Sequence, residues 1–149
     1  MGNFPETLKT WINLYLTPNR GYVATDYKTS AGYYLQMPPV RDFDYKNRKE
    51  LVAMLEEAFQ VGNPLMEAPD EAPEGSLVMS AAGYNSATEL EENTLPISIE
   101  MLTTCYEIRC PARLPNGGWD DGNFALSCSV PLELGCPAIA DAILEYLEP

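Results

Sequence analysis

Residues 10–37 read TWINLYLTPNRGYVATDYKTSAGYYLQM, and this stretch decides the fold. In TWINLYL, Ile12, Leu14 and Leu16 alternate with Trp, Asn and Tyr, which is the period of a strand with one buried face. The turn formers of TPNRG and KTSAG separate this segment from GYVATDY and from YYLQM, which are also β-like. We therefore predict three antiparallel strands joined by short turns.

Proline residues mark both ends of this predicted meander. Pro5 suits the first position of a helix, and Leu8 and Trp11 follow at helical spacing, so we expect a short helix over residues 5–10 leading into the first strand. Pro38-Pro39 is expected to end the third strand, because proline cannot donate a hydrogen bond to a neighbouring strand.

Two segments have the pattern of amphipathic helices. Residues 48–61, RKELVAMLEEAFQV, carry one apolar stripe, and Gly62 followed by Pro64 is typical of a helix end. A second helix, CPAIADAILEYL, opens with Pro137. The residues expected to face inward are Leu51, Met54, Leu55, Ala58 and Phe59 in the first helix, and Ile139, Ile143, Leu144 and Leu147 in the second.

The region between these helices is predicted to begin irregularly and then return to strands. Residues 63–76 hold three prolines and four acids, which is typical of a surface loop. Ser86 and Glu89 form an S-x-x-E capping box, which predicts a helix start. The other elements expected are strands at 96–102, 103–114 and 123–130, with a loop at 115–122 before the last of them.

These elements together predict an α+β fold, with α/β as the alternative. A chain of 149 residues is large enough to bury its own core, so we expect one domain over residues 1–149. Its expected architecture is a mostly antiparallel twisted sheet with two main amphipathic helices on one face.

The chain contains no histidine, which removes the usual general base at neutral pH and every Ser-His-Asp or Cys-His arrangement. Phosphate-binding glycine loops and clusters with metal-ligand spacing are not found in the sequence. We therefore expect no enzyme activity, no catalytic residue, no metal and no cofactor. A carboxylate-only hydrolase is the alternative, because glycosidase-like acid pairs need no histidine.

The four cysteines, Cys105, Cys110, Cys128 and Cys136, have no C-x-x-C spacing. We interpret them as buried free thiols of a cytoplasmic protein, with disulfides in an exported form as the alternative. The N-terminal sequence lacks the pattern of a secretory signal, and no apolar run is long enough to cross a membrane.

The net charge of −13 is distributed unevenly along the chain. Residues 1–63 hold seven basic and seven acidic side chains, whereas residues 64–149 hold two basic and fifteen acidic ones. Such a surface does not suit nucleic acid or an anionic membrane. It favours a basic protein partner, although acidity for solubility alone is the simpler explanation.

Three groups of residues in the acidic part are candidates for contacting that partner. The first is the Pro-rich loop, the second is the start of the helix that follows Ser86, and the third is the GGWDDG segment. Each also has an ordinary structural interpretation, as a solvated loop, a capped helix or a turn. The candidates are Glu67, Asp70, Glu71 and Glu74; Glu89, Glu91 and Glu92; and Trp119, Asp120 and Asp121.

Short motifs over residues 22–62 and near the end of the chain resemble the small immunity proteins of bacterial contact-dependent growth inhibition systems. The matching features are Lys28-Thr29, Gly32, an aromatic strand, Pro38-Pro39, the LxxMLxxAF helix, Pro131, Leu134-Gly135 and an Ala/Leu helix. The resemblance covers about half of the chain and implies a cytosolic inhibitor that binds the toxin domain of its own system, often a nuclease. It identifies no contacting residue, because such families vary their binding surface.

The acidic second part agrees with this implication independently, because a nuclease needs a basic surface to hold its substrate. We therefore expect tight binding to a cognate basic toxin domain, without direct binding to nucleic acid or to membrane. An acidic adaptor domain that has no toxin partner is the alternative.

Overall fold

A twisted sheet of seven strands organises the computed structural model, which describes residues 7–71 and 76–148. Its strands are β1 (Thr10–Leu16), β2 (Gly21–Thr29), β3 (Tyr34–Phe43), β4 (Leu65–Met66), β5 (Leu95–Met101), β6 (Cys105–Arg113) and β7 (Trp119–Pro131). Its helices are α1 (Arg48–Val61), α2 (Leu77–Ala81), α3 (Ala87–Asn93) and α4 (Gly135–Leu147), with a 3-10 turn at Leu132–Leu134. The strand order is β3-β2-β1-β5-β6-β7, and every neighbouring pair on this path is antiparallel. The prediction of an α+β fold with a mostly antiparallel sheet is confirmed.

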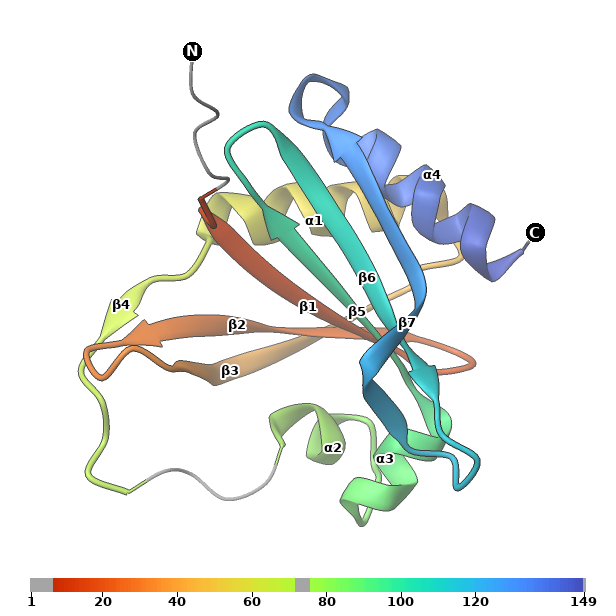
Figure 1. The fold of residues 1–149 in the computed structure, drawn as a ribbon. Coiled ribbons are helices and arrows are strands. Elements are labelled where there is room, and N and C mark those ends of the chain that lie inside the picture. The colour runs from red at the N-terminus through yellow and green to blue at the C-terminus, as the bar shows by residue number, and fades with distance from the viewer. Residues whose placement is uncertain (1–6, 72–75, 149) are drawn as a thin grey trace.

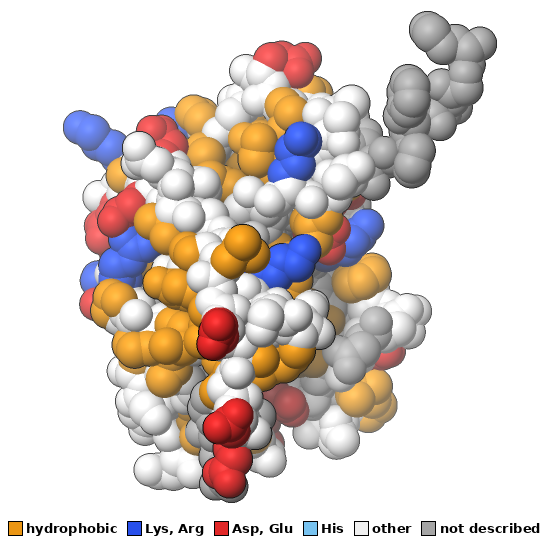
Figure 2. Space-filling view, turned by 90° about the vertical axis from the view of Figure 1, so that its left-hand side faces the viewer, with side chains coloured by type: hydrophobic (Ala, Val, Ile, Leu, Met, Phe, Trp, Pro, Cys, Tyr) orange, Lys and Arg blue, Asp and Glu red, His pale blue; other side chains and the backbone are white. Residues whose placement is uncertain are grey.

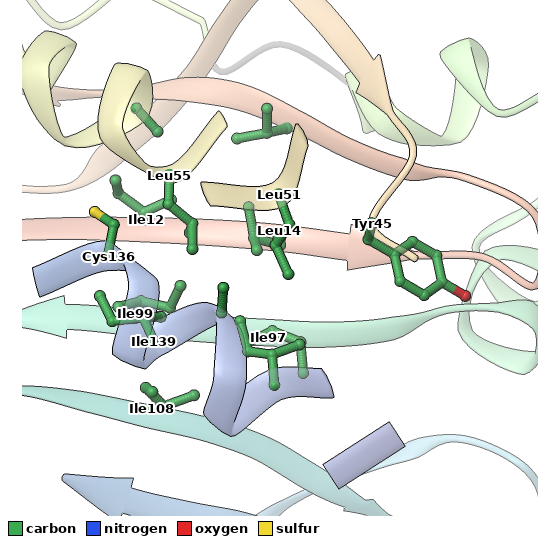
Figure 3. Packing of buried hydrophobic residues seen from close by; sticks show 14 of the residues in the cluster. Ile12, Leu14, Tyr45, Leu51, Leu55, Ile97, Ile99, Ile108, Cys136 and Ile139 are labelled. Carbon is green, nitrogen blue, oxygen red and sulfur yellow. The ribbon is translucent and has the colours of Figure 1, made fainter. Parts of the chain in front are cut away.

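The core lies between the sheet and helices α1 and α4, which pack against each other behind the sheet in Figure 1. The alternation expected for the first strand places Ile12 and Leu14 inward, where they pair across β1 and β5 with Ile99 and Ile97. Figure 3 shows these side chains facing Leu51 and Leu55 of α1 and Ile139 of α4. The helix stripe and the strand alternation therefore meet in one apolar layer.

The start of α1 is fixed by its own sequence. The side chain of Asn47 accepts a hydrogen bond from the backbone N–H of Glu50, and Gly62 ends the helix with a positive φ of 66°. The helix bounds of 48–61 agree with the prediction from the sequence.

Strands β1 and β2 pair at only one end, and the side chain of Asn63 fills the gap where they separate. Their register covers Leu14 to Leu16 on β1. Beyond it, Asn63 Nδ2 donates to the carbonyl oxygens of Trp11 (2.9 Å) and Asp26 (2.8 Å), and Asn63 Oδ1 accepts from Trp11 N–H (2.8 Å). Next along the chain, β4 pairs in parallel with the end of β2.

Three predictions of local structure are wrong. Pro38-Pro39 does not end β3, which runs to Phe43. Because β3 is an edge strand, the missing N–H groups of the two prolines are tolerated. The pairing register between β2 and β3 shifts at this point, between Val23 and Thr25 of β2. The loop at 115–122 is shorter than predicted, because Trp119 and Asp120 already pair with β6.

The third concerns the helix expected over residues 5–10. Residues 5 and 6 lie outside the described residues, 7–9 are not helical, and Thr10 opens β1. The irregular loop at 63–76 also contains the short strand β4. Within the described part of the chain, no helix has both the length and the apolar composition needed to cross a membrane.

Candidate functional site

Two of the three candidate groups lie together, at the tip of the β6–β7 hairpin. A Cβ added to Gly117 would lie 3.4 Å from Glu92 Cγ, and one added to Gly118 would lie 3.5 Å from Glu91 Oε2. The acidic end of α3 therefore lies directly against the hairpin turn, as the lower part of Figure 1 shows. We call this the hairpin surface, and define it by Glu91, Glu92, Leu114, Trp119, Asp120 and Phe124.

Arg113 holds the hairpin surface together. Its guanidinium donates to the backbone carbonyls of Glu91 and Thr94 at the end of α3, and to that of Gly117 (2.8 Å) in the turn. A cation at the carboxyl end of a helix also suits the helix dipole. One basic side chain therefore joins two acidic segments that are distant in the sequence.

Replacing Arg113 with methionine is expected to lower the free energy of unfolding by about 1–2 kcal/mol, because three carbonyls lose a charged donor. Amide hydrogen exchange should also become faster in α3, which loses its attachment to the hairpin. Arg20→Met is the control, since Arg20 makes an exposed ion pair with Asp42 and should cost less than about 1 kcal/mol. Equal losses in the two variants would show that Arg113 has no special part in this attachment.

Two of the candidate acids have local structural roles. Ser86 Oγ accepts from Glu89 N–H (3.1 Å), and Glu89 Oε2 accepts from Asn85 N–H (3.3 Å), so the predicted capping box is present with its return bond shifted by one residue. Asp120 accepts from Gly122 N–H and from Asn123 Nδ2. The hydrogen bond from Asn123, followed by that from Gly122, lowers the pKa of Asp120.

Apolar side chains lie among the acids of the hairpin surface. Trp119 is half-buried, and its Nε1 is buried without a hydrogen-bond partner among the described residues. Leu114 is 39% exposed and Phe124 is 51% exposed. The Phe124 ring lies 5.6 Å from the guanidinium carbon of Arg109. Aromatic side chains are enriched at the centres of protein–protein interfaces, whereas acidic side chains are found mainly at their polar rims.

The third candidate group is separate. Glu67, Asp70 and Glu71 are exposed in the segment after β4, which Figure 1 places at the opposite side of the molecule from the hairpin. Leu65 beside them is 81% exposed. Figure 2 faces this side and shows acidic side chains in the lower middle of the view. Glu74 and the side chain of Asp121 lie outside the described residues.

Within the described residues, none of the candidate acids forms an ion pair. The four ion pairs join Arg20 to Asp42, Arg41 to Glu57, Arg48 to Asp141 and Arg109 to Glu100. We call the exposed stretch with Leu65, Glu67, Asp70 and Glu71 the β4 segment. Both it and the hairpin surface therefore present negative charge that the described part of the chain does not neutralise.

A polar cluster on the sheet face opposite α1 and α4 was missed by the sequence analysis. Asp26 of β2 is only 5% exposed, and Asn13 Nδ2 donates to its carboxylate at 3.3 Å. Burial raises the pKa of Asp26 to about 6. The hydrogen bond from Asn13 lowers this pKa, but by less than burial raises it. The pKa of Tyr15 is raised, first by burial and second by the negative charge of the nearby Asp26. Strand alternation could have placed Asp26 on this face, but not its burial.

No disulfide joins the four cysteines, all of which lie in the described residues. Burial raises the pKa of the Cys136 thiol to about 11 and also raises those of Cys110 and Cys128. Thiols with raised pKa values are poor nucleophiles at neutral pH. Among the residues that the structure describes, no group of three or more acidic or cysteine side chains is placed to hold a metal ion.

Comparisons with known proteins establish the fold and no more. No protein-family model matches the chain, and no curated protein matches it. A solved structure titled "Protein of Unknown Function NMB0488 from Neisseria meningitidis" is similar, with a TM-score of 0.63 and 13% sequence identity. The match covers 99% of this chain and 96% of that one. At this identity, the likeness concerns the arrangement of helices and strands alone.

Proposed function

We propose that this protein is a cytoplasmic immunity protein that neutralises a cognate basic toxin domain, which is often a nuclease in such systems. It binds the toxin stoichiometrically, covers the toxin's active or substrate-binding surface, and carries out no chemistry itself. In this proposal α1 and α4, the two main amphipathic helices, are scaffold, and the partner is bound elsewhere.

The hairpin surface is the observation that carries this proposal. It combines acids that lack ion pairs with the exposed apolar residues Leu114 and Phe124. The acids can attract a basic domain from a distance, and the apolar side chains can be desolvated on contact. The β4 segment offers the same combination on a smaller scale. An acidic adaptor domain without a toxin partner remains the second candidate function.

The test is to look for a large toxin gene directly upstream of the gene for this chain, and to co-express its toxin domain with this protein. We expect growth to be rescued, and the purified pair to associate at a rate that falls steeply as salt is raised while dissociation changes little. If no such toxin gene lies nearby, or if the pair does not bind, the proposal is wrong.

Charge reversal locates the interface. Glu91→Lys combined with Glu92→Lys is expected to weaken toxin binding at least about tenfold, because it removes complementary charge beside the apolar contacts. The matched control is Glu133→Lys with Glu145→Lys, two exposed acids near and on α4, which changes the net charge by the same amount. Binding by isothermal calorimetry should distinguish the variants. Equal effects would mean that only the total charge matters and that the hairpin surface is not the interface.

A further inference from the structure

Two side-chain contacts pass over strand β2 from β1 to β3. The rings of Trp11 and Tyr34 meet edge to face with their centroids 5.0 Å apart, and Gln36 Nε2 donates to the hydroxyl of Tyr15 at 3.2 Å. Because β2 lies between β1 and β3 in the sheet, both contacts must cross its outer face. Asp26 is the β2 residue paired with Gln36, so it lies beneath these crossing contacts.

The carboxylate of Asp26 has no cationic partner among the described residues. Its one hydrogen bond is the 3.3 Å contact from the neutral amide of Asn13. Titratable or charged groups on the neighbouring strands share this face, and within the described residues none of them forms an ion pair with Asp26: Tyr15 of β1, Tyr22 and Lys28 of β2, Tyr34 and Asp42 of β3, and Glu100 of β5. A buried charge without a partner is costly, and natural proteins normally pair it.

We propose that Asp26, together with Trp11, Tyr15 and Tyr34, forms a site that receives a lysine or arginine side chain of a protein partner. Because Asp26 is only 5% exposed, the two contacts that cross β2 must separate when this side chain enters. The carboxylate supplies a charge-assisted hydrogen bond, and the three aromatic rings supply cation–π attraction. Tryptophan and tyrosine are also the residues most enriched at the centres of binding surfaces. The inference deepens the proposed function and rests on it, since it names a contact that the basic toxin domain would make.

Charge complementarity favours a basic partner over a second copy of this chain. All five arginines of the chain already contact acidic side chains or backbone carbonyls within the described residues, so a second copy could offer only its four lysines. Two copies with a net charge of −13 each would also repel one another. One carboxylate among aromatic rings is a poor metal site, because hard cations need several oxygen ligands.

The test compares toxin binding by the unaltered chain and by Asp26→Asn, a substitution that keeps the shape and the bond from Asn13. At pH 7.5, D26N is expected to bind the toxin domain at least about tenfold more weakly, because the incoming cation loses its charged acceptor. Lowering the pH to 5.5 should weaken binding by the unaltered chain but change binding by D26N much less. Asp42→Asn is the matched control, and it should change affinity less than about threefold.

Each outcome decides between the two proposals. If the unaltered chain binds the toxin and D26N binds it equally well with the same pH dependence, the Asp26 site is wrong and the proposed function stands. If the unaltered chain binds no toxin domain, the proposed function fails and the Asp26 site fails with it. Unfolding of D26N cannot imitate the expected result, since this variant is expected to be the more stable protein.

Discussion

Replacing Asn63 with alanine is expected to lower the free energy of unfolding by about 2–4 kcal/mol, the largest loss that we predict for a polar side chain here. The substitution removes the donors to the carbonyls of Trp11 and Asp26 and the acceptor for Trp11 N–H. Each part-buried backbone group left unpaired costs about 1–3 kcal/mol, partly recovered where water enters. At this point β1 and β2 are no longer paired, and the side chain of Asn63 makes the hydrogen bonds that a neighbouring strand would otherwise make. When it is removed, no strand is in place to satisfy these backbone groups.

Urea denaturation followed by circular dichroism measures this loss. Asn93→Ala is the control, because Asn93 makes a single exposed bond to the carbonyl of Glu89 and should cost less than about 1 kcal/mol. Asn63→Asp distinguishes the contribution of the two donated hydrogen bonds from that of the accepted one. It keeps the acceptor for Trp11 N–H but places a carboxylate against two carbonyl oxygens. It should be at least as destabilising as N63A at pH 7. A loss below about 1 kcal/mol for N63A would contradict the role given to this side chain.

Replacing Asp26 with asparagine is expected to raise the free energy of unfolding by about 1–3 kcal/mol at pH 7. The pKa of Asp26 is about 6 in the folded chain, whereas an unfolded aspartate has a pKa near 3.9. Between these values the folded state binds the proton more tightly, so stability is highest below the unfolded pKa and falls as the pH rises to about 6. Asparagine has no proton to lose and avoids this cost.

The pH dependence distinguishes this explanation from a general effect of the substitution. The stability difference between D26N and the unaltered chain should be near zero at pH 4 and should grow until about pH 6 to 7. Asp42→Asn should show no such gain, because Asp42 is an exposed partner of Arg20. A direct measurement of the Asp26 carboxyl pKa by carbon NMR is the second check. A value near 4 would contradict both the predicted gain and its cause.

The regular elements followed from the sequence because their signals are local. The Ile12, Leu14, Leu16 alternation and the apolar stripe of residues 48–61 each predict one buried face, and both faces are buried. Pro38-Pro39 misled the prediction, since the tolerance of proline depends on whether a strand lies at the sheet edge. That position is a property of the whole sheet and is not visible in the strand's own sequence.

The candidate site was only partly predictable for the same reason. Composition identified the acids, but it could not show that Glu91 and Glu92 lie against Gly117 and Gly118 while Glu67 lies far away. Asp26 was overlooked because its burial depends on contacts between residues of β1 and β3 that cross the strand between them. Tyr34 of the third strand, which was not among the candidate residues from the sequence, belongs to the proposed cation site.

The central place of β1 has a consequence for how the chain folds during synthesis. Strand β1 pairs with β2 on one side and along its whole length with β5, residues 95–101, on the other. The first three strands and α1 therefore leave the ribosome while one long edge of β1 has no partner and part of the apolar layer is missing. Such pairings between distant segments slow folding, and unpaired edges favour aggregation. We expect the native sheet to close only after β5 has emerged.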